Sequence, residues 1–203
     1  MKTFLTLLLL VPFLCFSQES LEQELDLISS SEDAKLFAKS HKKVNKSKVF
    51  TFNKEKHKTR LADDLFKLSK GGKKVVKTDF KTTYYKIINK EEVDYYRFNI
   101  IVFNEANKAK GNEVLAKYNE GYKFKDLAKY YSSGPTAKMG GDTGWIKPGD
   151  LTTAFDQSAF SSSVNTLVTI DDVELKKYYI VIKTQNSTPI EEITVLKFTE
   201  ATK

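Results

Sequence analysis

The sequence predicts an α+β fold in which a sheet of mainly antiparallel strands is flanked by helices. Residues 95–103 are the strongest strand-like segment, because three consecutive β-branched residues form a buried run there. Residues 178–183 and 193–198 alternate apolar and polar positions near the end of the chain, which favours two closing strands. Helix-like segments lie between them, so the order strand, helix, helix, loop, helix, strand, strand indicates an α+β domain.

The N-terminal half also mixes helices and strands. Residues 18–43 have helical spacing of apolar positions, interrupted at residues 29–33, where serines and acidic residues can cap a new helix. A short strand, a helix and a strand-rich segment are then expected at residues 49–52, 59–68 and 75–89.

The C-terminal half continues in the same manner. Asn104 can cap a helix that ends at Gly121, and residues 124–131 form a second, shorter helix. A loop follows at residues 132–138, and residues 152–160 read as a third helix.

The first seventeen residues resemble an export signal. Lys2 precedes an apolar run at residues 4–14, which is too short to span a bilayer. Cys15 and Ser17 then place small residues at the −3 and −1 positions of a cleavage site, so residues 1–17 are expected to be a cleaved secretory signal peptide. The alternative is a lipoprotein in which Cys15 is lipidated, but Leu14 just before it fits such a site poorly. The mature chain is therefore expected in the periplasm or secreted, with no membrane span and no cysteine chemistry.

Charge is distributed unevenly over a chain whose net charge is +7. Residues 18–34 carry six carboxylates and no basic residue, whereas residues 35–90 carry eighteen Lys or Arg against four acidic residues. A basic block of this kind serves as a solvated surface, or attracts nucleic acid, anionic lipid or acidic clients. Its lysines alternate with apolar residues at structural spacing, so a solvated surface is favoured and no nucleic acid is expected.

A glycine-rich stretch carries the most specific pattern. Residues 139–146 read Met-Gly-Gly-Asp-Thr-Gly-Trp-Ile, preceded by Phe-Lys-Asp-Leu-Ala at residues 124–128 and followed by Phe155 and Phe160. Together these segments resemble the signature of the parvulin-type (PpiC-like) peptidyl-prolyl cis-trans isomerases. The resemblance covers residues 97–183 and implies the parvulin-like sheet with flanking helices. Asp142, a short acidic residue next to glycines, is expected to cap or brace the glycine turn as a structural residue.

The resemblance also implies a reaction. An X-Pro peptide bond rotates over a barrier of about 20 kcal/mol, so its isomerisation is slow in water. Catalysis requires an apolar pocket for the proline ring and polar groups that favour the twisted amide. It requires no cofactor and no metal, and the implied partner is an unfolded or extended polypeptide that contains proline.

Three polar positions of the family are replaced in this chain. A His on the first strand matches Asn99, a second His matches Tyr179 (or Tyr178 if the register shifts by one), and a Cys or Asp matches Gly134. Asn99 and Tyr179 are the catalytic candidates, since they could still hydrogen-bond across the sheet. Neither titrates near neutral pH.

The family's three proline-pocket residues match Thr143, Leu151 and Phe155. These are the candidate substrate-binding residues. The alternative is that Leu151 and Phe155 serve only as core residues of a short helix on a sheet.

The chain is expected to comprise a signal peptide, a region at residues 18–95 and the parvulin-like domain at residues 96–200. Phe66 and Phe160 each end a helix and are each followed eighteen residues later by a pair of tyrosines. Residues 20–95 are therefore interpreted as a shortened second copy without the glycine stretch. The alternative is coincidence between two helix-then-strand segments.

Three functions are compatible with these patterns. One is an exported isomerase, and the second is a chaperone or binding module in which catalysis has decayed. A third is surface or nucleic-acid binding through the lysines, which predicts affinity that falls steeply with salt. Hydrolase chemistry finds no support, because His41 and His57 both lie outside the parvulin-like region.

Overall fold

The computed structural model describes residues 21–201, so the predicted signal peptide lies outside the described residues. The helices are α1 (Leu21–Leu27), α2 (Ser31–Ser40), α3 (Lys42–Asn45), α4 (Arg60–Phe66), α5 (Lys110–Asn119), α6 (Phe124–Tyr131) and α7 (Thr153–Ala159), with 3-10 turns at Glu105–Asn107 and Ala137–Met139. The strands are β1 (Lys48–Asn53), β2 (Lys73–Lys77), β3 (Lys81–Asn104), β4 (Asp142–Ile146), β5 (Leu167–Asp172) and β6 (Lys177–Ala201). No helix within residues 21–201 is long and apolar enough to cross a membrane.

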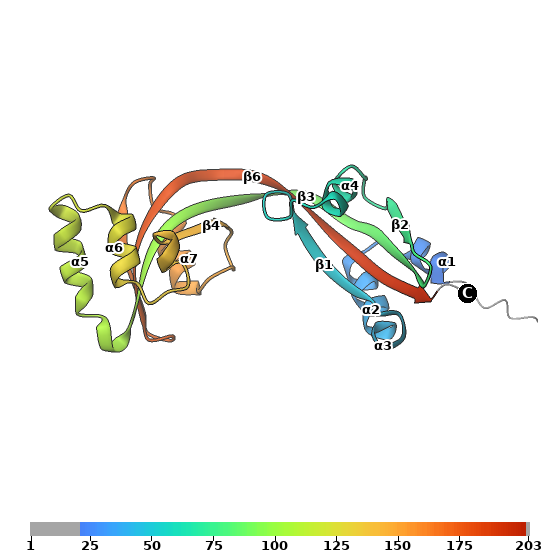
Figure 1. Cartoon of the computed structure of the whole chain (residues 1–203), viewed down its shortest axis with the longest axis horizontal. Coiled ribbons are helices and arrows are strands. Elements are labelled where there is room, and N and C mark those ends of the chain that lie inside the picture. Colours follow the sequence, from blue (N-terminus) through green and yellow to red (C-terminus); the bar gives the residue numbers. More distant parts are fainter. Residues whose placement is uncertain (1–20, 202–203) are drawn as a thin grey trace, which may run out of the picture.

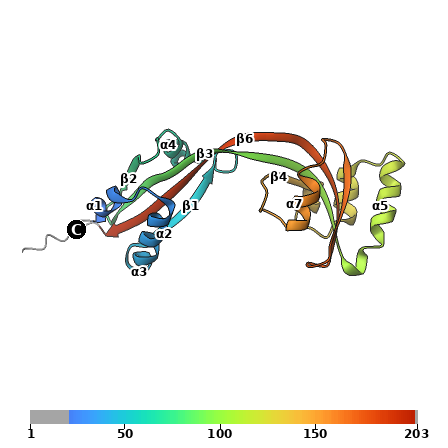
Figure 2. The ribbon, with the colours of Figure 1, turned by 180° about the vertical axis from the view of Figure 1, so that it is seen from behind.

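Two long antiparallel strands, β3 and β6, run through the whole molecule and connect two lobes (Figure 1). The N-lobe consists of residues 21–93 together with residues 190–201, and the C-lobe consists of residues 96–188. The end of the chain returns to the helices of the N-lobe, as the view from behind also shows (Figure 2). The lobes are therefore built on one continuous sheet.

The continuity of these strands corrects the expected pattern of separate elements. The strand-like residues 81–89 and 95–103 belong to one strand, β3, and residues 178–183 and 193–198 belong to β6. Register shifts between Ile87 and Asn89 and around Arg97 let the paired strands bend without a break, because a bulge inserts an unpaired residue while pairing continues. The sequence pattern also missed β5, which forms a hairpin with β6.

In the N-lobe the strand order is β2-β3-β6-β1. Helices α1 and α2 cover one face, where Phe37 packs against Phe198 and the side chain of Tyr84 stacks on Phe198. Helix α4 covers the opposite face, where its residue Leu65 shares a hydrophobic core with Tyr85 of β3. Because neighbouring residues of a strand point to opposite faces, Tyr84 and Tyr85 supply both cores.

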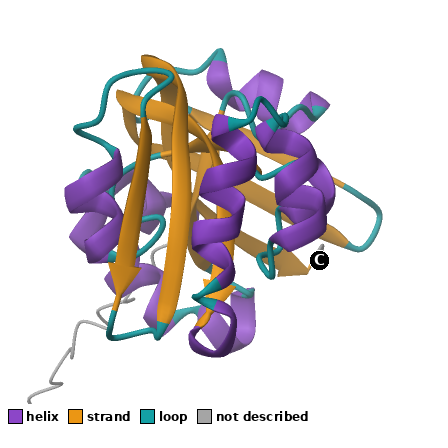
Figure 3. Cartoon of the chain, turned by 90° about the vertical axis from the view of Figure 1, so that its left-hand side faces the viewer, coloured by secondary structure: helices purple, strands orange, loops and turns teal. Residues whose placement is uncertain are grey.

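The C-lobe repeats this arrangement. Its strand order is β5-β6-β3-β4, with helices on both faces of the sheet (Figure 3). Helices α5 and α6 cover the face that includes Tyr178, whereas α7 covers the face that includes Tyr179. The lobes differ in how they are assembled: the C-lobe sheet comes from one continuous segment, whereas the N-lobe sheet needs residues 190–201 of β6, which pair with β1 and with the first half of β3.

The cap contacts of α4 and α7 also correspond. Thr59 and Thr152 cap the two N-termini through their hydroxyls. The ammonium of Lys90 donates to the carbonyls of Phe66 and Leu68 at 2.6 and 3.3 Å, and the ammonium of Lys183 donates to those of Phe160 and Ser162 at 2.6 and 2.8 Å. Lysine on the neighbouring strand thus satisfies carbonyls at or just beyond the end of each helix.

These correspondences support the proposal that the N-lobe is a second, shortened copy of the C-lobe. The expected boundary between residues 95 and 96 falls inside β3, and residues 190–200, which were assigned to the parvulin-like domain, pair with β1. The division into two repeats therefore stays a proposal, with residues 190–201 added to the first copy.

A buried polar network joins the lobes. Glu192 is 6% exposed and accepts hydrogen bonds from the hydroxyl of Tyr95, from Lys147 at 2.7 Å and from Asn53 at 3.4 Å. Burial raises the pKa of Glu192, but the three donors outweigh it and hold that pKa below its usual range. Because Asn53 belongs to the N-lobe and Lys147 to the C-lobe, the carboxylate ties both to the shared strands.

Candidate active site

The glycine-rich stretch forms a turn that enters β4 alongside β3. Gly141 has φ +84° and its carbonyl accepts from the amide of Ile100 at 2.8 Å. Asp142 accepts two hydrogen bonds from the Arg97 guanidinium, at 2.8 and 2.5 Å, and one from the amide of Gly144 at 2.9 Å. Arg97, helped by that amide, lowers the pKa of Asp142 despite its partial burial. The expectation that Asp142 braces the turn is confirmed.

Helix α7 places an aromatic cluster on the sheet. Phe155 lies one turn after the Thr152 cap and is fully buried, with ring centroids 5.4 Å from Phe98, 6.0 Å from Phe160 and 6.2 Å from Tyr179. Edge-on contacts of this kind stabilise a packed core. Phe155 therefore has no surface open to a ligand in this structure, although it lies directly next to Tyr179.

Tyr179 lies on the same face of the sheet. It pairs with Val102 on β3 and Ile170 on β5, and only 7% of it is exposed. Burial, and secondarily the negative charge of Asp172, raises the pKa of its phenol. Tyr179 consequently stays protonated at neutral pH, so its hydroxyl can donate a hydrogen bond but cannot serve as a base.

Asn99 lies on the other face. Its register partner is Ile182, three positions along the ladder from the pair formed by Val102 and Tyr179. Side chains alternate along a strand, so Asn99 shares its face with Ile101 under α6, whereas Tyr179 lies under α7. The structure therefore does not bring Asn99 and Tyr179 together, and the expected hydrogen bond across the sheet is not present.

The remaining candidates surround the glycine turn and the start of α7. The hydroxyl of Thr143 donates to the carbonyls of Gly144 (2.8 Å) and Phe98 (3.2 Å) and accepts from the amide of Phe98 at 3.1 Å, so it holds β4 on β3. Leu151 precedes α7 and is 41% exposed, which makes it available to a ligand. Gly134 packs on Val102, where an added Cβ would lie 2.7 Å from a methyl carbon.

Two polar residues of the region were not predicted from the sequence. Asp172 ends β5, is 3% exposed and accepts from the amide of Leu175 at 3.0 Å, a contact that lowers its pKa. Glu192 belongs to the network between the lobes. The signal for Glu192 is the charged pair Glu191-Glu192 between Ile190 and Ile193, because a carboxylate buried between apolar residues needs hydrogen-bond donors nearby.

The chemistry available here is hydrogen bonding and apolar contact. Within residues 21–201 no cluster of three or more histidine, cysteine or carboxylate side chains could hold a metal ion. The three positions that match the family's polar residues now carry an amide, a glycine and a neutral phenol.

Comparison with known proteins agrees with this fold. Residues 85–188, which are 104 of the 203 residues, match the family described as the PPIC-type PPIase domain. The foldase protein PrsA of Geobacillus kaustophilus (strain HTA426) is 35% identical over 106 residues, which are 48% of this chain and 36% of that protein. The chaperone SurA of Nitrosospira multiformis is 44% identical over 46 residues, which are 23% of this chain and 10% of that protein.

Among solved structures, the crystal structure of PrsA from Bacillus subtilis is 30% identical with a TM-score of 0.40, covering 45% of this chain and 35% of that one. The chain thus spans about a third of the length of the PrsA proteins and a smaller part of SurA. The family match covers every element of the C-lobe and extends along β3 into the N-lobe as far as residue 85. The chain therefore belongs to the PPIC-type, or parvulin-type, peptidyl-prolyl isomerase family.

Proposed function

We propose that this chain is a folding factor that acts outside the cytoplasm and accelerates cis-trans isomerisation of X-Pro bonds in unfolded polypeptides. Family membership is the single observation that carries the activity. Relatives named as foldase and chaperone support a polypeptide client. The signal-like residues 1–17 support export to the periplasm or the medium.

In this proposal the proline ring binds over the start of α7. Leu151 contacts the proline ring directly. Phe155 is buried beneath this position and would contact the ring only after a shift of α7. Thr143 acts indirectly by holding β4 in place. Tyr179 donates a hydrogen bond that favours the twisted amide, whereas Asn99 acts from the α6 side of the sheet.

The test is an exchange measurement on a short proline peptide by NMR, which needs no coupled protease. We expect acceleration above the uncatalysed rate that does not change between pH 6 and 9, because the phenol of Tyr179 remains protonated there. Tyr179→Phe should lower the rate roughly 100-fold, the lower end of the range for loss of one positioned hydrogen-bond donor. Leu151→Ala should weaken peptide binding, and Leu175→Ala, at another exposed leucine, should change neither quantity. No acceleration at stoichiometric protein would refute isomerase function.

The second candidate is a binding module without turnover. The observations that favour it are the separation of Asn99 from Tyr179 and the complete burial of Phe155. The lysine-rich residues 35–90 would then attract acidic unfolded clients. This function would be identified if the chain suppresses aggregation of a client protein, if salt weakens that suppression, and if the chain does not accelerate proline exchange.

A further inference from the structure

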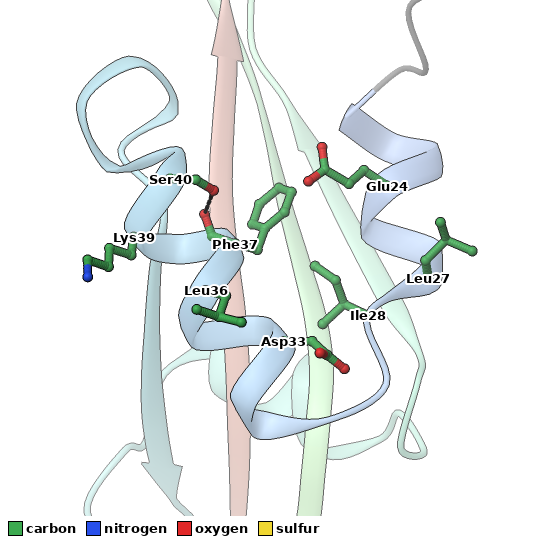
Figure 4. A pocket seen from close by; sticks show the side chains of 8 residues that line it. All are labelled: Glu24, Leu27, Ile28, Asp33, Leu36, Phe37, Lys39 and Ser40. Carbon is green, nitrogen blue, oxygen red and sulfur yellow. Dashed lines mark hydrogen bonds between the residues drawn. The ribbon is translucent and has the colours of Figure 1, made fainter.

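The N-lobe contains an open groove between α1 and α2 that has no role in the proposed isomerisation. Its volume is about 830 Å³. Ile28 and Phe37 lie deepest, at 5% and 4% exposure, and they pack on the sheet beneath. Leu27 and Leu36 lie along the two helices at the rim (Figure 4). The groove therefore has an apolar floor and apolar edges.

The two leucines at the rim are apolar side chains that are mostly exposed to solvent. Leu27 is 72% exposed and Leu36 is 66% exposed, although each would gain about 1.5–3 kcal/mol from complete burial. A single exposed leucine is ordinary, but here both leucines line the same groove as the buried Ile28 and Phe37. Exposed apolar side chains gathered at one groove mark sites of interaction.

The corresponding helices of the C-lobe show that this opening is not required by the fold. Between α5 and α6 the rings of Tyr118 and Phe124 are in contact, with centroids 6.0 Å apart. The hydroxyl of Tyr131 also donates to Glu113 at 2.5 Å, linking the two helices. Helices α1 and α2 occupy the same place on the N-lobe sheet but leave the groove between them.

Charge on the groove is mainly negative. Glu24 and Asp33 line it, and Lys39 is the one cation among its lining residues. Helix α1 has no basic residue, and the first turn of α2 adds Glu32. Some of this charge is engaged, since Asp26 forms an ion pair with Lys73 at 2.5 Å and Glu24 lies 3.8 Å from His41. The carboxylates that line the groove still favour a cationic ligand.

We propose that the groove between α1 and α2 binds a segment of client polypeptide that carries large aliphatic or aromatic side chains next to Lys or Arg. The apolar side chains cover Ile28 and Phe37 between the two rim leucines, and the basic neighbours lie against Glu24 and Asp33. This is helix-in-groove or extended-segment recognition by apolar anchors with charge complementarity at the edge. The inference rests on the proposed folding function for the choice of a polypeptide client.

The probe is a labelled twelve-residue peptide with two leucines and a phenylalanine flanked by lysines, without proline, together with a twin in which glutamates replace the lysines. Fluorescence anisotropy with the whole chain should show binding of the lysine peptide and at least tenfold weaker binding of the glutamate peptide. Leu27→Ser with Leu36→Ser should weaken the lysine peptide at least tenfold. Leu175→Ser, at a 52% exposed leucine of the C-lobe, is the matched control and should leave binding unchanged.

Charge reversal gives a second readout. Glu24→Lys with Asp33→Lys should invert the preference, so that the glutamate peptide binds more tightly than the lysine peptide. Glu24 is half-exposed and Asp33 is exposed, but Asp33 also accepts a hydrogen bond from the Ser30 hydroxyl at 2.7 Å in the first turn of α2, where a lysine is unfavourable. Circular dichroism therefore checks folding, and Glu24→Lys alone, which leaves the cap intact, should narrow the preference in the same direction. An unchanged preference would overturn the charge assignment and with it the proposal.

The result is separable from isomerase function. The rim variants should exchange a short proline peptide at the unaltered rate, and Tyr179→Phe should bind the lysine peptide with unaltered affinity. If the lysine peptide does not bind at millimolar concentration, the proposal is wrong whatever the exchange rate. The proposal would also be overturned if the chain does not bind the peptide but self-associates in sedimentation, and if Leu36→Ser abolishes that self-association. The groove would then bind a second copy of the chain.

Discussion

Gly141 is the residue at which backbone freedom and close approach are both required. Its φ of +84° is rarely adopted by a residue with a Cβ, and an added Cβ would lie 2.5 Å from the carbonyl oxygen and 2.9 Å from the amide of Ile100. The same residue accepts the hydrogen bond that holds the turn on β3. The glycine-rich stretch is therefore a structural requirement of the turn, independent of whether the protein catalyses a reaction.

Gly141→Ala should cost about 3 kcal/mol of unfolding free energy, because it adds a collision with backbone atoms to the strain of positive φ. Gly121→Ala is the control, since Gly121 has φ +97° and open space around it. That substitution should cost about 1–2 kcal/mol from the backbone conformation alone. If urea unfolding shows the same loss of unfolding free energy in both variants, the contact with Ile100 contributes nothing to that loss.

At the level of secondary-structure elements, helices α4 and α7 each end at carbonyls that accept hydrogen bonds from a lysine of a sheet strand. Lys183 is 5% exposed, and burial lowers the pKa of its ammonium, yet that group donates to two carbonyls at or beyond the end of α7. Lys90 does the same for α4. A lysine in a strand thus determines where a helix far away in sequence ends.

Lys183→Met should destabilise the chain by about 1.5–3 kcal/mol, the range for hydrogen bonds to a charged group, because methionine retains the apolar stem but not the donors. Hydrogen exchange should become faster at the end of α7 and remain unchanged in α4. Lys90→Met is the reciprocal control, with faster exchange in α4 and no change in α7. Faster exchange throughout both lobes in either variant would contradict the local role of these lysines.

At the scale of the whole molecule, the order of the chain and the order of the lobes differ. Ile193, Val195, Leu196 and Phe198 have no exposed surface and belong to the core of the N-lobe, although they lie near the end of the chain. The C-lobe lies between the two parts of the N-lobe in sequence. Neither lobe can be cut out at residue 95 without dividing β3.

A chain that ends at Pro189 should therefore lose the N-lobe. Removal of four fully buried side chains forfeits roughly 6–12 kcal/mol of burial, which is comparable to the whole stability of a small domain. Amides of α2, β1 and α4 should lose protection in hydrogen exchange, while those of α6 and β5 keep it. A chain that ends at Glu200 is the control and should retain both lobes. If the amides of β1 keep their protection in the shorter chain, residues 190–201 are not required for the N-lobe.

The local elements and the family could be predicted from the sequence. Periodicity and capping placed most helices and the strongest strand, and the glycine stretch with Phe155 and Phe160 identified the parvulin-type fold, because these features depend on neighbouring residues and on fixed spacings. Asp142 was likewise predictable, since a short acidic side chain next to glycines braces its own turn.

How these elements combine could not be predicted, because it depends on contacts between segments that are distant in sequence. The bulges that make β3 and β6 continuous leave no clear local signal, so two long strands were read as four. The face occupied by Asn99 depends on pairing with Ile182, and the closure of the N-lobe by residues 190–201 depends on contacts between segments more than a hundred residues apart. Whether a side chain such as Phe155 lines a pocket or fills a core depends on what packs above it, and that is set by the whole fold.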